Sequence, residues 1–399
     1  MPVPHSRPSV GAAFSPVENE APLRWLRGLH LAPKEGLGAG RRALGLALLT
    51  WLPIAIWALA TGRLVGSGGS GSPDDSGESL LRHYGVHVRC LLVIPLLILA
   101  EPMVHRAARA IAARLAATAA TPEARTAFDA ATRAVARLRD ATLPWVLLLG
   151  AAIAWSLADD PRTHGDAMAW ALDADGSLGF GGWWFGYVVR PVFLALLLAW
   201  AWRIVLLSLW MGRVGRIDLT LVPTHPDRAG GVALIEKLPG AFALVSLALS
   251  AMLASRWAHE ILHHGASLAA YRHVAVVFVI LWSLLLLLPL LAFAPALGRT
   301  RKNAILAYSA LVGRQGELVH QRWIEGRQVA PEPILEAPEI GPVADAAAMF
   351  DAVVNMRRAP VGKVSVIGIL LPLALPLLVV AAVQVPLKDL LLKLAKALV

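Results

Sequence analysis

The chain has 399 residues, of which 57% are hydrophobic and 16% are charged, and its formal net charge is +10. Soluble proteins contain a little under half apolar residues and about a quarter charged ones, so the composition excludes an ordinary soluble domain. The positive charge lies in alternate segments between apolar blocks, which argues against nucleic acid as a partner. The single cysteine, Cys90, excludes an intrachain disulfide.

Apolar blocks of membrane length predict an all-α fold, a polytopic transmembrane helix bundle with about seven spans and cytosolic amphipathic helices. We expect spans near residues 43–61, 86–104, 142–158, 185–211, 240–258, 274–297 and 364–383. They divide the chain into a cytosolic N-terminal segment (1–42), a transmembrane region (43–297) and a cytosolic helical segment (298–363). The last part, 364–399, combines the seventh span with an interfacial amphipathic helix. The lipid bilayer is therefore the first partner that the sequence predicts.

The segments between the spans are mostly polar. Residues 1–39 are expected to be flexible, apart from a short amphipathic piece at 23–29. Thr121-Pro122-Glu123 has the pattern of a helix start and opens an amphipathic helix that runs to about Asp140. A further helix, 344–358, repeats apolar residues on one face and is predicted to lie against the inner ends of the spans.

The distribution of lysine and arginine predicts the orientation in the membrane. Residues 1–42, 105–141, 212–239 and 298–363 hold 26 of them, whereas 62–85, 159–184 and 259–273 hold four. Because positively charged loops stay in the cytosol, the N-terminus is predicted inside and, with seven spans, the C-terminus is predicted in the periplasm. This topology changes if the short block 142–158 or the proline-containing block 364–383 does not cross.

Two stretches resemble an uncharacterised family of multi-pass bacterial inner-membrane proteins. One is the turn at residues 225–231 (HPDRAGG), directly before a span. The other lies directly before the last span and consists of Ala344-Asp345, Phe350, Val353, Met356-Arg357 and Pro360. The resemblance covers roughly the C-terminal half of the chain. It implies a protein of the bacterial inner (cytoplasmic) membrane and implies no reaction.

A histidine cluster follows the fifth span. His259-Glu260-x-x-His263 matches the HExxH pattern, in which two imidazoles on one helix face bind Zn²⁺ and the glutamate is the general base. His83 and His87 have the same spacing and are predicted on the same side of the membrane. The favoured interpretation is that these side chains suit the membrane interface, because no third zinc ligand follows at the usual spacing. A metal-binding or proton-sensing cluster is the alternative, with zinc as its candidate cofactor.

Charged residues inside the spans are a second lead. Glu101 and Arg203 are predicted near the inner ends of the second and fourth spans, where they could meet at similar depth. An unpaired charge in hydrocarbon costs about 2.5–3.5 kcal/mol on insertion scales, so each should face a partner or a water-filled cavity. The pair therefore either fixes helix packing or lines a path for an ion or solute. Arg190 is predicted near the outer end of its span, where it can reach the interface.

The turn at 225–231 offers two glycines, Gly230 and Gly231, which could let backbone N–H groups approach a phosphate. It lacks the spacing of a Walker loop or a dinucleotide fingerprint. The favoured interpretation is a tight re-entry into the membrane after His225, with Asp227 and Arg228 paired locally or with the 344–358 helix.

Three classes of function follow. The first is movement or sensing of an ion or small solute, based on Glu101, Arg203 and prolines that can break helices around a cavity. These prolines stand at positions 95, 191, 289, 372 and 376. The second is a non-catalytic scaffold or sensor whose cytosolic helices bind a protein partner or a second copy of the chain. The third is a zinc-dependent membrane enzyme using His259, Glu260 and His263, and it is the least favoured because no third-ligand signature and no partner motif of the intramembrane metalloproteases is present. No catalytic triad, nucleophilic cysteine or tandem CxxC points to another enzyme class.

Overall fold

The computed structural model describes residues 14–30, 33, 36–65, 79–158, 168, 170–172, 177–263, 265–328 and 341–384. Helices dominate this part of the chain, and its only β-type pairing is an isolated bridge between Leu172 and Leu178. The predicted all-α class is therefore confirmed. The interfacial helix expected within 364–399 and most of the loop at 159–184 lie outside the described residues.

Six helices are long and apolar enough to cross a membrane in the described part of the chain. Their bounds are Ala39–Ala60, Tyr84–Thr118, Phe180–Val214, Ala233–Leu262, Leu268–Ile324 and Lys363–Ala382. Helices α5 (Pro122–Asp140) and α6 (Thr142–Ala158) meet at a bend of 42° and supply a seventh candidate only if they count as one span. All of the apolar blocks predicted as spans are thus helical, and several helices extend beyond the apolar block from which they were predicted.

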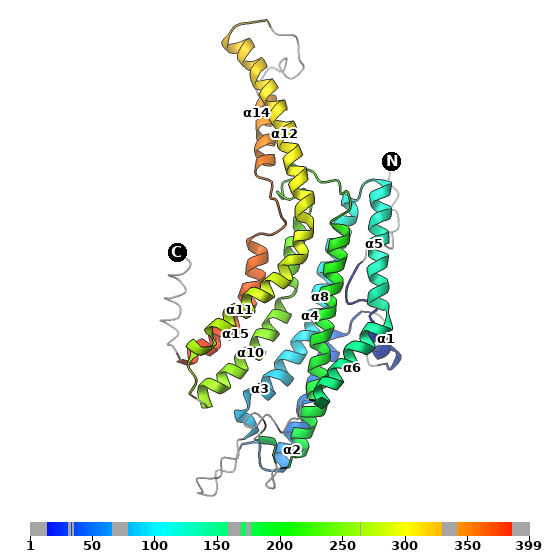
Figure 1. Cartoon of the computed structure of the whole chain (residues 1–399), viewed down its shortest axis with the longest axis vertical. Coiled ribbons are helices and arrows are strands. Elements are labelled where there is room, and N and C mark those ends of the chain that lie inside the picture. Colours follow the sequence, from blue (N-terminus) through cyan, green and yellow to red (C-terminus); the bar gives the residue numbers. More distant parts are fainter. Residues whose placement is uncertain are drawn as a thin grey trace.

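The bundle contains several composite helices (Figure 1). α2 is Ala39–Ala60, and the next span joins α3 (Tyr84–His87), a π-helical segment (Val88–Val93) and α4 (Ile94–Thr118). α7 (Phe180–Trp184), a second π segment (Phe185–Val189) and α8 (Arg190–Val214) form another. After α9 (Leu238–Ala241) come α10 (Ala243–His263), α11 (Leu268–Leu287), α12 (Ala294–Val319), α14 (Gly341–Val354) and α15 (Lys363–Gln384).

Several prolines lie at or near irregular segments of the helices. Pro95 and Pro191 each stand two positions after the end of a π segment. A proline ring clashes with the carbonyl four residues earlier, and a local widening of the helix relieves that clash. Pro289 lies in a 3-10 turn, Leu288–Phe293, whereas Pro372 lies inside the continuous helix α15. Pro289 thus interrupts the α-helix, whereas Pro372 does not, and a cavity around these prolines stays a prediction.

The face of α11 is strongly apolar and uncovered. Val277 is 54% exposed, Ile280 51% and Leu284 57%, although their helix belongs to the bundle. Apolar surface of this extent on a helix of 20 residues suits contact with lipid chains. The helical apolar segments are compatible with a multi-pass integral membrane protein.

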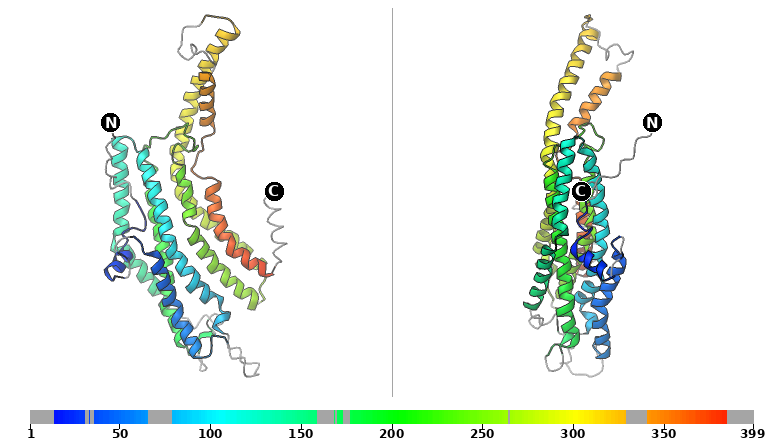
Figure 2. Two further views of the ribbon diagram at one scale, coloured as in Figure 1. Left: turned by 180° about the vertical axis from the view of Figure 1, so that it is seen from behind. Right: turned by 90° about the vertical axis from the view of Figure 1, so that its right-hand side faces the viewer.

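α12 and α14 form a hairpin that extends away from the other helices (Figures 1 and 2). We call this the α12–α14 hairpin, and the neighbouring side of the bundle the hairpin end. Met349 of α14 is 50% exposed, while Val353 and Met356 at its base are buried. The expectation that this helix lies against the ends of the spans is therefore wrong. A helix with one apolar face can bury it along any apolar neighbour, and here α12 supplies that neighbour.

The described part of the N-terminal segment, from Phe14, is packed into the bundle, contrary to the expectation of flexibility outside the amphipathic piece at 23–29. In its described part, Phe14, Val17, Ala21 and Leu23 are all at most 1% exposed, and α1 spans Ala21–Gly28. Apolar side chains spaced through an otherwise polar stretch can fill a groove between helices without forming a long apolar block. That is why hydropathy did not reveal them.

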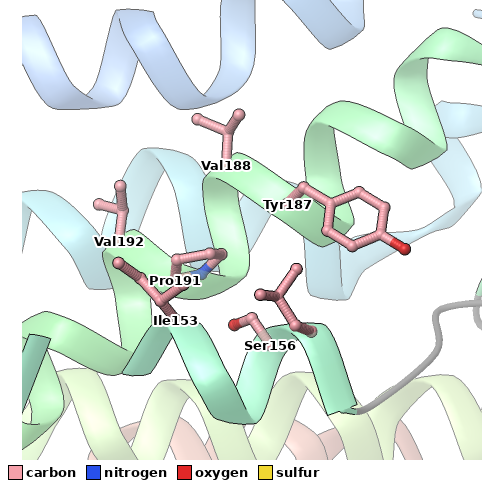
Figure 3. Close-up of a pocket in the computed structure, with 7 residues that line it drawn as sticks. Ile153, Ser156, Tyr187, Val188, Pro191 and Val192 are labelled. Carbon is pink, nitrogen blue, oxygen red and sulfur yellow. The ribbon is translucent and has the colours of Figure 1, made fainter. Parts of the chain in front are cut away.

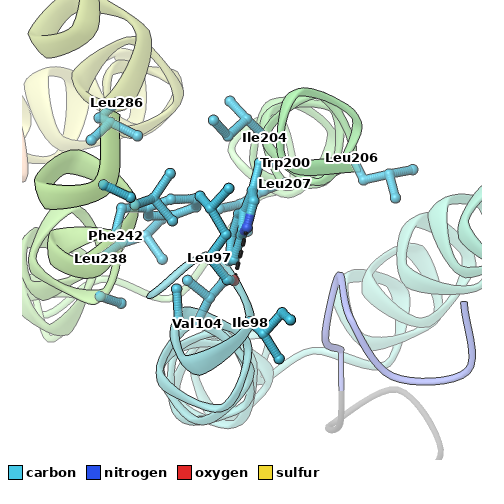
Figure 4. Packing of buried hydrophobic residues seen from close by; sticks show 14 of the residues in the cluster. Leu97, Ile98, Val104, Trp200, Ile204, Leu206, Leu207, Leu238, Phe242 and Leu286 are labelled. Atoms are coloured by element: carbon cyan, nitrogen blue, oxygen red, sulfur yellow. Dashed lines mark hydrogen bonds between the residues drawn. The ribbon is translucent and has the colours of Figure 1, made fainter. Parts of the chain in front are cut away.

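The core lies where α4, α8 and the start of α10 meet (Figure 4). Trp200 of α8 packs against Phe242 with ring centroids 5.8 Å apart. Its indole Nε1 donates to the carbonyl oxygen of Leu97 at 3.0 Å. Because a buried indole N–H needs an acceptor, this bond fixes Trp200 against α4.

Candidate functional site: a buried ionic network

Four charged side chains from four segments meet inside the bundle. They are Glu20, just before α1, Arg42 of α2, Glu101 of α4 and Arg203 of α8. Glu101 is 0% exposed, Glu20 1% and Arg203 2%. Their formal charges cancel, so the network can be buried as a neutral unit.

Glu101 stands at the centre and accepts hydrogen bonds from both arginines. Arg42 Nη1 donates to its Oε2 at 2.6 Å and Arg42 Nη2 donates to its Oε1 at 3.4 Å. Arg203 Nη2 donates to Oε1 at 2.8 Å. The predicted pairing of Glu101 with Arg203 is present, and Arg42 is an additional partner. Whether the pair lines a transport path stays a prediction.

Arg203 also holds Glu20. Its Nε donates to Glu20 Oε2 at 3.1 Å, and its Nη2 donates to Glu20 Oε1. The guanidinium carbon lies 4.8 Å from the ring centroid of Trp200, the residue that the bond to Leu97 fixes. Arg203 Nη1 is buried without a hydrogen-bond acceptor in the described part of the chain. One arginine thus joins α4, α8 and the N-terminal segment.

The segment that carries Glu20 is anchored at other points. Phe14 stacks on Trp210 of α8, with ring centroids 4.7 Å apart and planes within 13°. Arg139 Nη1 donates to the Ser15 carbonyl oxygen at 2.7 Å. The ring Nδ1 of His105 and the Ser15 hydroxyl lie 2.8 Å apart. Glu20 therefore sits on a segment that is held in place by both polar and aromatic contacts.

Burial raises the pKa of the Glu20 carboxyl above its ordinary value, although the Arg203 guanidinium acts in the opposite direction. A carboxyl with a raised pKa accepts a proton more readily in this docked position than in water. By linkage, docking of the N-terminal segment is favoured as the pH falls and weakened as it rises. Sequence reasoning missed Glu20 because it lies outside every apolar block.

The predicted histidine cluster is only partly assembled. The rings of His83 and His259 lie 5.4 Å apart, and His83 also contacts Trp170 with centroids 6.3 Å apart. His87 is engaged elsewhere, since its Nδ1 accepts from Trp51 Nε1 at 3.0 Å and its Nε2 lies 3.0 Å from the Leu80 carbonyl oxygen. Both ring nitrogens of His87 therefore have protein partners, and metal binding by His87 stays a prediction.

No group of three or more His, Cys, Asp or Glu side chains that could hold a metal occurs among the described residues. Glu260 is half-buried on α10, and the side chain of His263 lies outside the description. The structure therefore brings together two of the predicted metal ligands, His83 and His259, with no third ligand among the described side chains. Zinc binding stays a prediction for this pair.

The turn at 225–231 is closed by its own carboxylate. Asp227 Oδ1 accepts from the backbone N–H groups of Ala229 at 2.8 Å and Gly231 at 3.1 Å, and Oδ2 accepts from Ala233 at 3.1 Å. His225 Nδ1 lies 2.9 Å from Oδ1. These donors are therefore not available to a phosphate.

Burial acts to raise the pKa of Asp227, but the three backbone donors and His225 outweigh it and lower the pKa below its usual value. Gly230 and Gly231 have φ of +65° and +96°, and Arg228 has φ of +56°. Left-handed backbone of this kind is why glycines stand here. These contacts give the turn a fixed structure, and we call residues 225–231 the joint.

This joint connects α4 to the base of the hairpin. Arg114 of α4 donates from Nε to the Gly231 carbonyl oxygen at 2.7 Å, and its Nη2 lies 3.1 Å from His225 Nε2. On the other side, the Arg357 N–H donates to the Arg228 carbonyl oxygen at 2.7 Å, and Arg357 Nη1 pairs with Glu236. The two stretches that carry the family resemblance therefore contact each other.

A pocket of about 360 Å³ lies at the edge of the bundle between α6 and the second π segment (Figure 3). Its walls are almost wholly apolar and include Ile153, Tyr187, Val188 and Pro191. The Ser156 hydroxyl is buried without a hydrogen-bond partner in the described structure. An apolar recess on this surface suits a lipid chain better than a polar solute.

No protein-family model matches the chain, and neither a curated protein nor a solved structure shows detectable similarity to it. The ionic network and the joint are therefore interpreted from their own geometry.

Proposed function

We propose that this protein senses or moves an ion or small solute across the bacterial inner membrane, and that the Glu20–Arg203–Glu101–Arg42 network responds to it. The observation that carries the proposal is Glu101, a fully buried carboxylate shared between arginines of two helices. Ionisable side chains inside a membrane bundle are costly, and they commonly mark ion pathways or switches. A proton is the ion that this network can itself accept, because two of its four groups are carboxyls.

The contacts favour sensing over movement. Glu20 contacts Arg203 directly, and Glu20, Glu101 and Arg203 are each at most 2% exposed among the described residues, which suits a closed network more than a solute path. α4 carries Glu101 and, thirteen residues later, Arg114, which holds the turn at the hairpin base. A change at Glu101 would therefore reach the hairpin through one helix about 20 Å long between these positions. Orientation with the hairpin in the cytosol follows the predicted distribution of lysine and arginine.

Two measurements on the same protein test the proposal. For movement, purified protein is reconstituted in vesicles containing a pH-sensitive dye, and proton flux is compared between the wild type and Glu101→Gln. For sensing, spin labels at Arg133→Cys of α5 and Leu311→Cys of α12 report the hairpin position. We expect the distance distribution to shift in Glu101→Gln and with pH. The proposal would be overturned if no proton flux is detected and the distance distribution changes neither in Glu101→Gln nor with pH.

A matched control keeps the label experiment specific. Glu18 lies two residues before Glu20 but is paired only at 3.7 Å with Arg109, and both side chains are over one-third exposed. Glu18→Gln removes the same charge from the same segment without touching the network. It should leave the distance distribution of the wild type unchanged.

A non-catalytic scaffold is the second candidate function, and the projecting hairpin favours it. Leu306 of α12 is 63% exposed and Met349 of α14 is 50% exposed, on a part of the molecule that lies beyond the other helices. Exposed apolar side chains of this kind can bind a protein partner or a second copy of the chain. Light scattering after detergent subtraction tests the second copy: a wild-type dimer that becomes a monomer in Met349→Glu supports it, and a wild-type monomer excludes it.

A further inference from the structure

Arg89 is partly buried, and its surroundings differ from those of three other arginines that are partly or fully buried. Arg42, Arg139 and Arg203 each donate to a carboxylate. Arg89, in the π segment Val88–Val93, pairs with no carboxylate of the described residues, and its Nε is buried without an acceptor there. A positive charge inside a membrane bundle normally faces a partner, so this guanidinium is suited to an anionic ligand.

Two aromatic rings hold the guanidinium in place. Its Cζ lies 4.9 Å from the ring centroid of Phe185 and 5.2 Å from that of Phe193. Both rings are buried, at 7% and 8% exposure. Cation–π contact uses the flat face of a guanidinium and leaves the N–H groups on its edge free to donate. The rings therefore fix the orientation of Arg89 and leave its donors unused.

The position of Arg89 brings it within reach of a lipid headgroup. The composite span begins at Tyr84, so Arg89 lies about 7–8 Å from its end at 1.5 Å per residue. Glu101 lies about 18 Å deeper along the same helix, so the two sites are separate. Arg190 of the neighbouring span adds a second positive charge that acts on Arg89. Because no carboxylate of the described residues pairs with Arg89, its guanidinium attracts anions.

We propose that Arg89, held by Phe185 and Phe193, binds a phosphate group at the end of the bundle opposite the hairpin. A planar guanidinium presents paired N–H donors that match two oxygens of one phosphate group. No carboxylate of the described residues accepts from these donors of Arg89. The phosphate belongs either to a phospholipid headgroup or to a free anion. This site does not depend on the function proposed for the Glu101 network.

Native mass spectrometry of the full chain in detergent tests the site. The protein is titrated with phosphatidylglycerol and with a glucosyl-diacylglycerol of identical chains, which lacks phosphate. We expect the phospholipid to bind at least tenfold more tightly to the wild type, and the two lipids to bind alike to Arg89→Met. Equal binding of both lipids to the wild type, or a preference that survives in Arg89→Met, would overturn the proposal.

Inorganic phosphate then distinguishes the two sources. Displacement of phosphatidylglycerol by millimolar phosphate assigns a free anion as an occupant, and retention of the lipid assigns the headgroup. Arg82→Met is the control, because Arg82 is exposed near the same end of the span and its loss changes the net charge equally. It should keep the full preference.

Arg89→Lys covers the case in which Arg89→Met does not fold. It retains the positive charge and loses the planar pair of donors, so we expect a folded protein with a reduced preference. An undiminished preference in Arg89→Lys would contradict paired donation to phosphate.

Discussion

Replacement of Glu101 by Gln should destabilise the protein far more than replacement of an exposed acid. The carboxylate accepts three hydrogen bonds at 2.6, 2.8 and 3.4 Å from Arg42 and Arg203, and its side chain is 0% exposed. Glutamine is nearly isosteric, but it removes the charge and turns an N–H₂ group toward one arginine. Loss of one partner from a buried ion pair costs about 3–5 kcal/mol, because the remaining charge is left buried.

Thermal unfolding in detergent, followed by tryptophan fluorescence, measures this cost. We expect the Tm of Glu101→Gln to fall by about 4–6 °C. Glu18→Gln should change it by no more than about 1–2 °C, because an exposed ion pair contributes about 0–1 kcal/mol. Equal shifts in the two variants would refute the assignment of Glu101 to a buried network.

A double-mutant cycle separates the network from simple loss of packing. Arg42→Met removes the partner on α2, and the double variant Arg42→Met/Glu101→Gln leaves Glu20 with Arg203 as an isolated pair. Residues in one network couple by about 0.5–3 kcal/mol. The double variant should therefore be more stable than the sum of the two single losses predicts. Additive losses would show that Arg42 and Glu101 do not interact.

Three further predictions concern the joint and the histidine pair. Gly230→Ala should lower the free energy of unfolding by about 1–2 kcal/mol, because the residue has φ +65° and a new Cβ would lie 3.0 Å from a neighbouring side chain. Gly212→Ala is the control, since Gly212 has an open helical position, and it should be neutral or stabilising in the same unfolding assay. Asp227 has a lowered pKa in the folded state, so its stabilising contribution is complete above the unfolded pKa of about 4 and is lost as the pH falls through the folded pKa. Asp227→Asn should therefore cost about 1.5–3 kcal/mol of stability at pH 7 and should reduce the fall of Tm at acidic pH. A Tm–pH profile with an unchanged acidic part would contradict this. If zinc is bound, elemental analysis of chelator-free protein should find it in the wild type and not in His83→Ala or His259→Ala, whereas metal retained in both variants would exclude this pair as ligands.

The sequence determined the class of the protein and the places of its helices. Hydrophobicity is a property of a short stretch of chain, and a block of about 20 apolar residues predicts a span whatever lies elsewhere. The helix start at Thr121 is equally local, and its side chain accepts from the Ala124 N–H at 3.1 Å as the pattern requires. The Glu101–Arg203 pair could also be predicted from the sequence, since a buried charge needs a partner and these two residues are expected at a similar depth in the membrane.

Only the tertiary structure decided what surrounds these residues. Glu20 and Arg203 are 183 positions apart and Arg42 and Glu101 are 59 apart, so no local pattern announces either contact. The burial of residues 14–23 depends on a groove that exists only once α4, α5 and α8 have packed. The same holds for Arg89, whose aromatic partners come from another span. Local composition places a helix in the membrane, whereas the free energy of a buried charge depends on which distant side chains the packed bundle sets beside it.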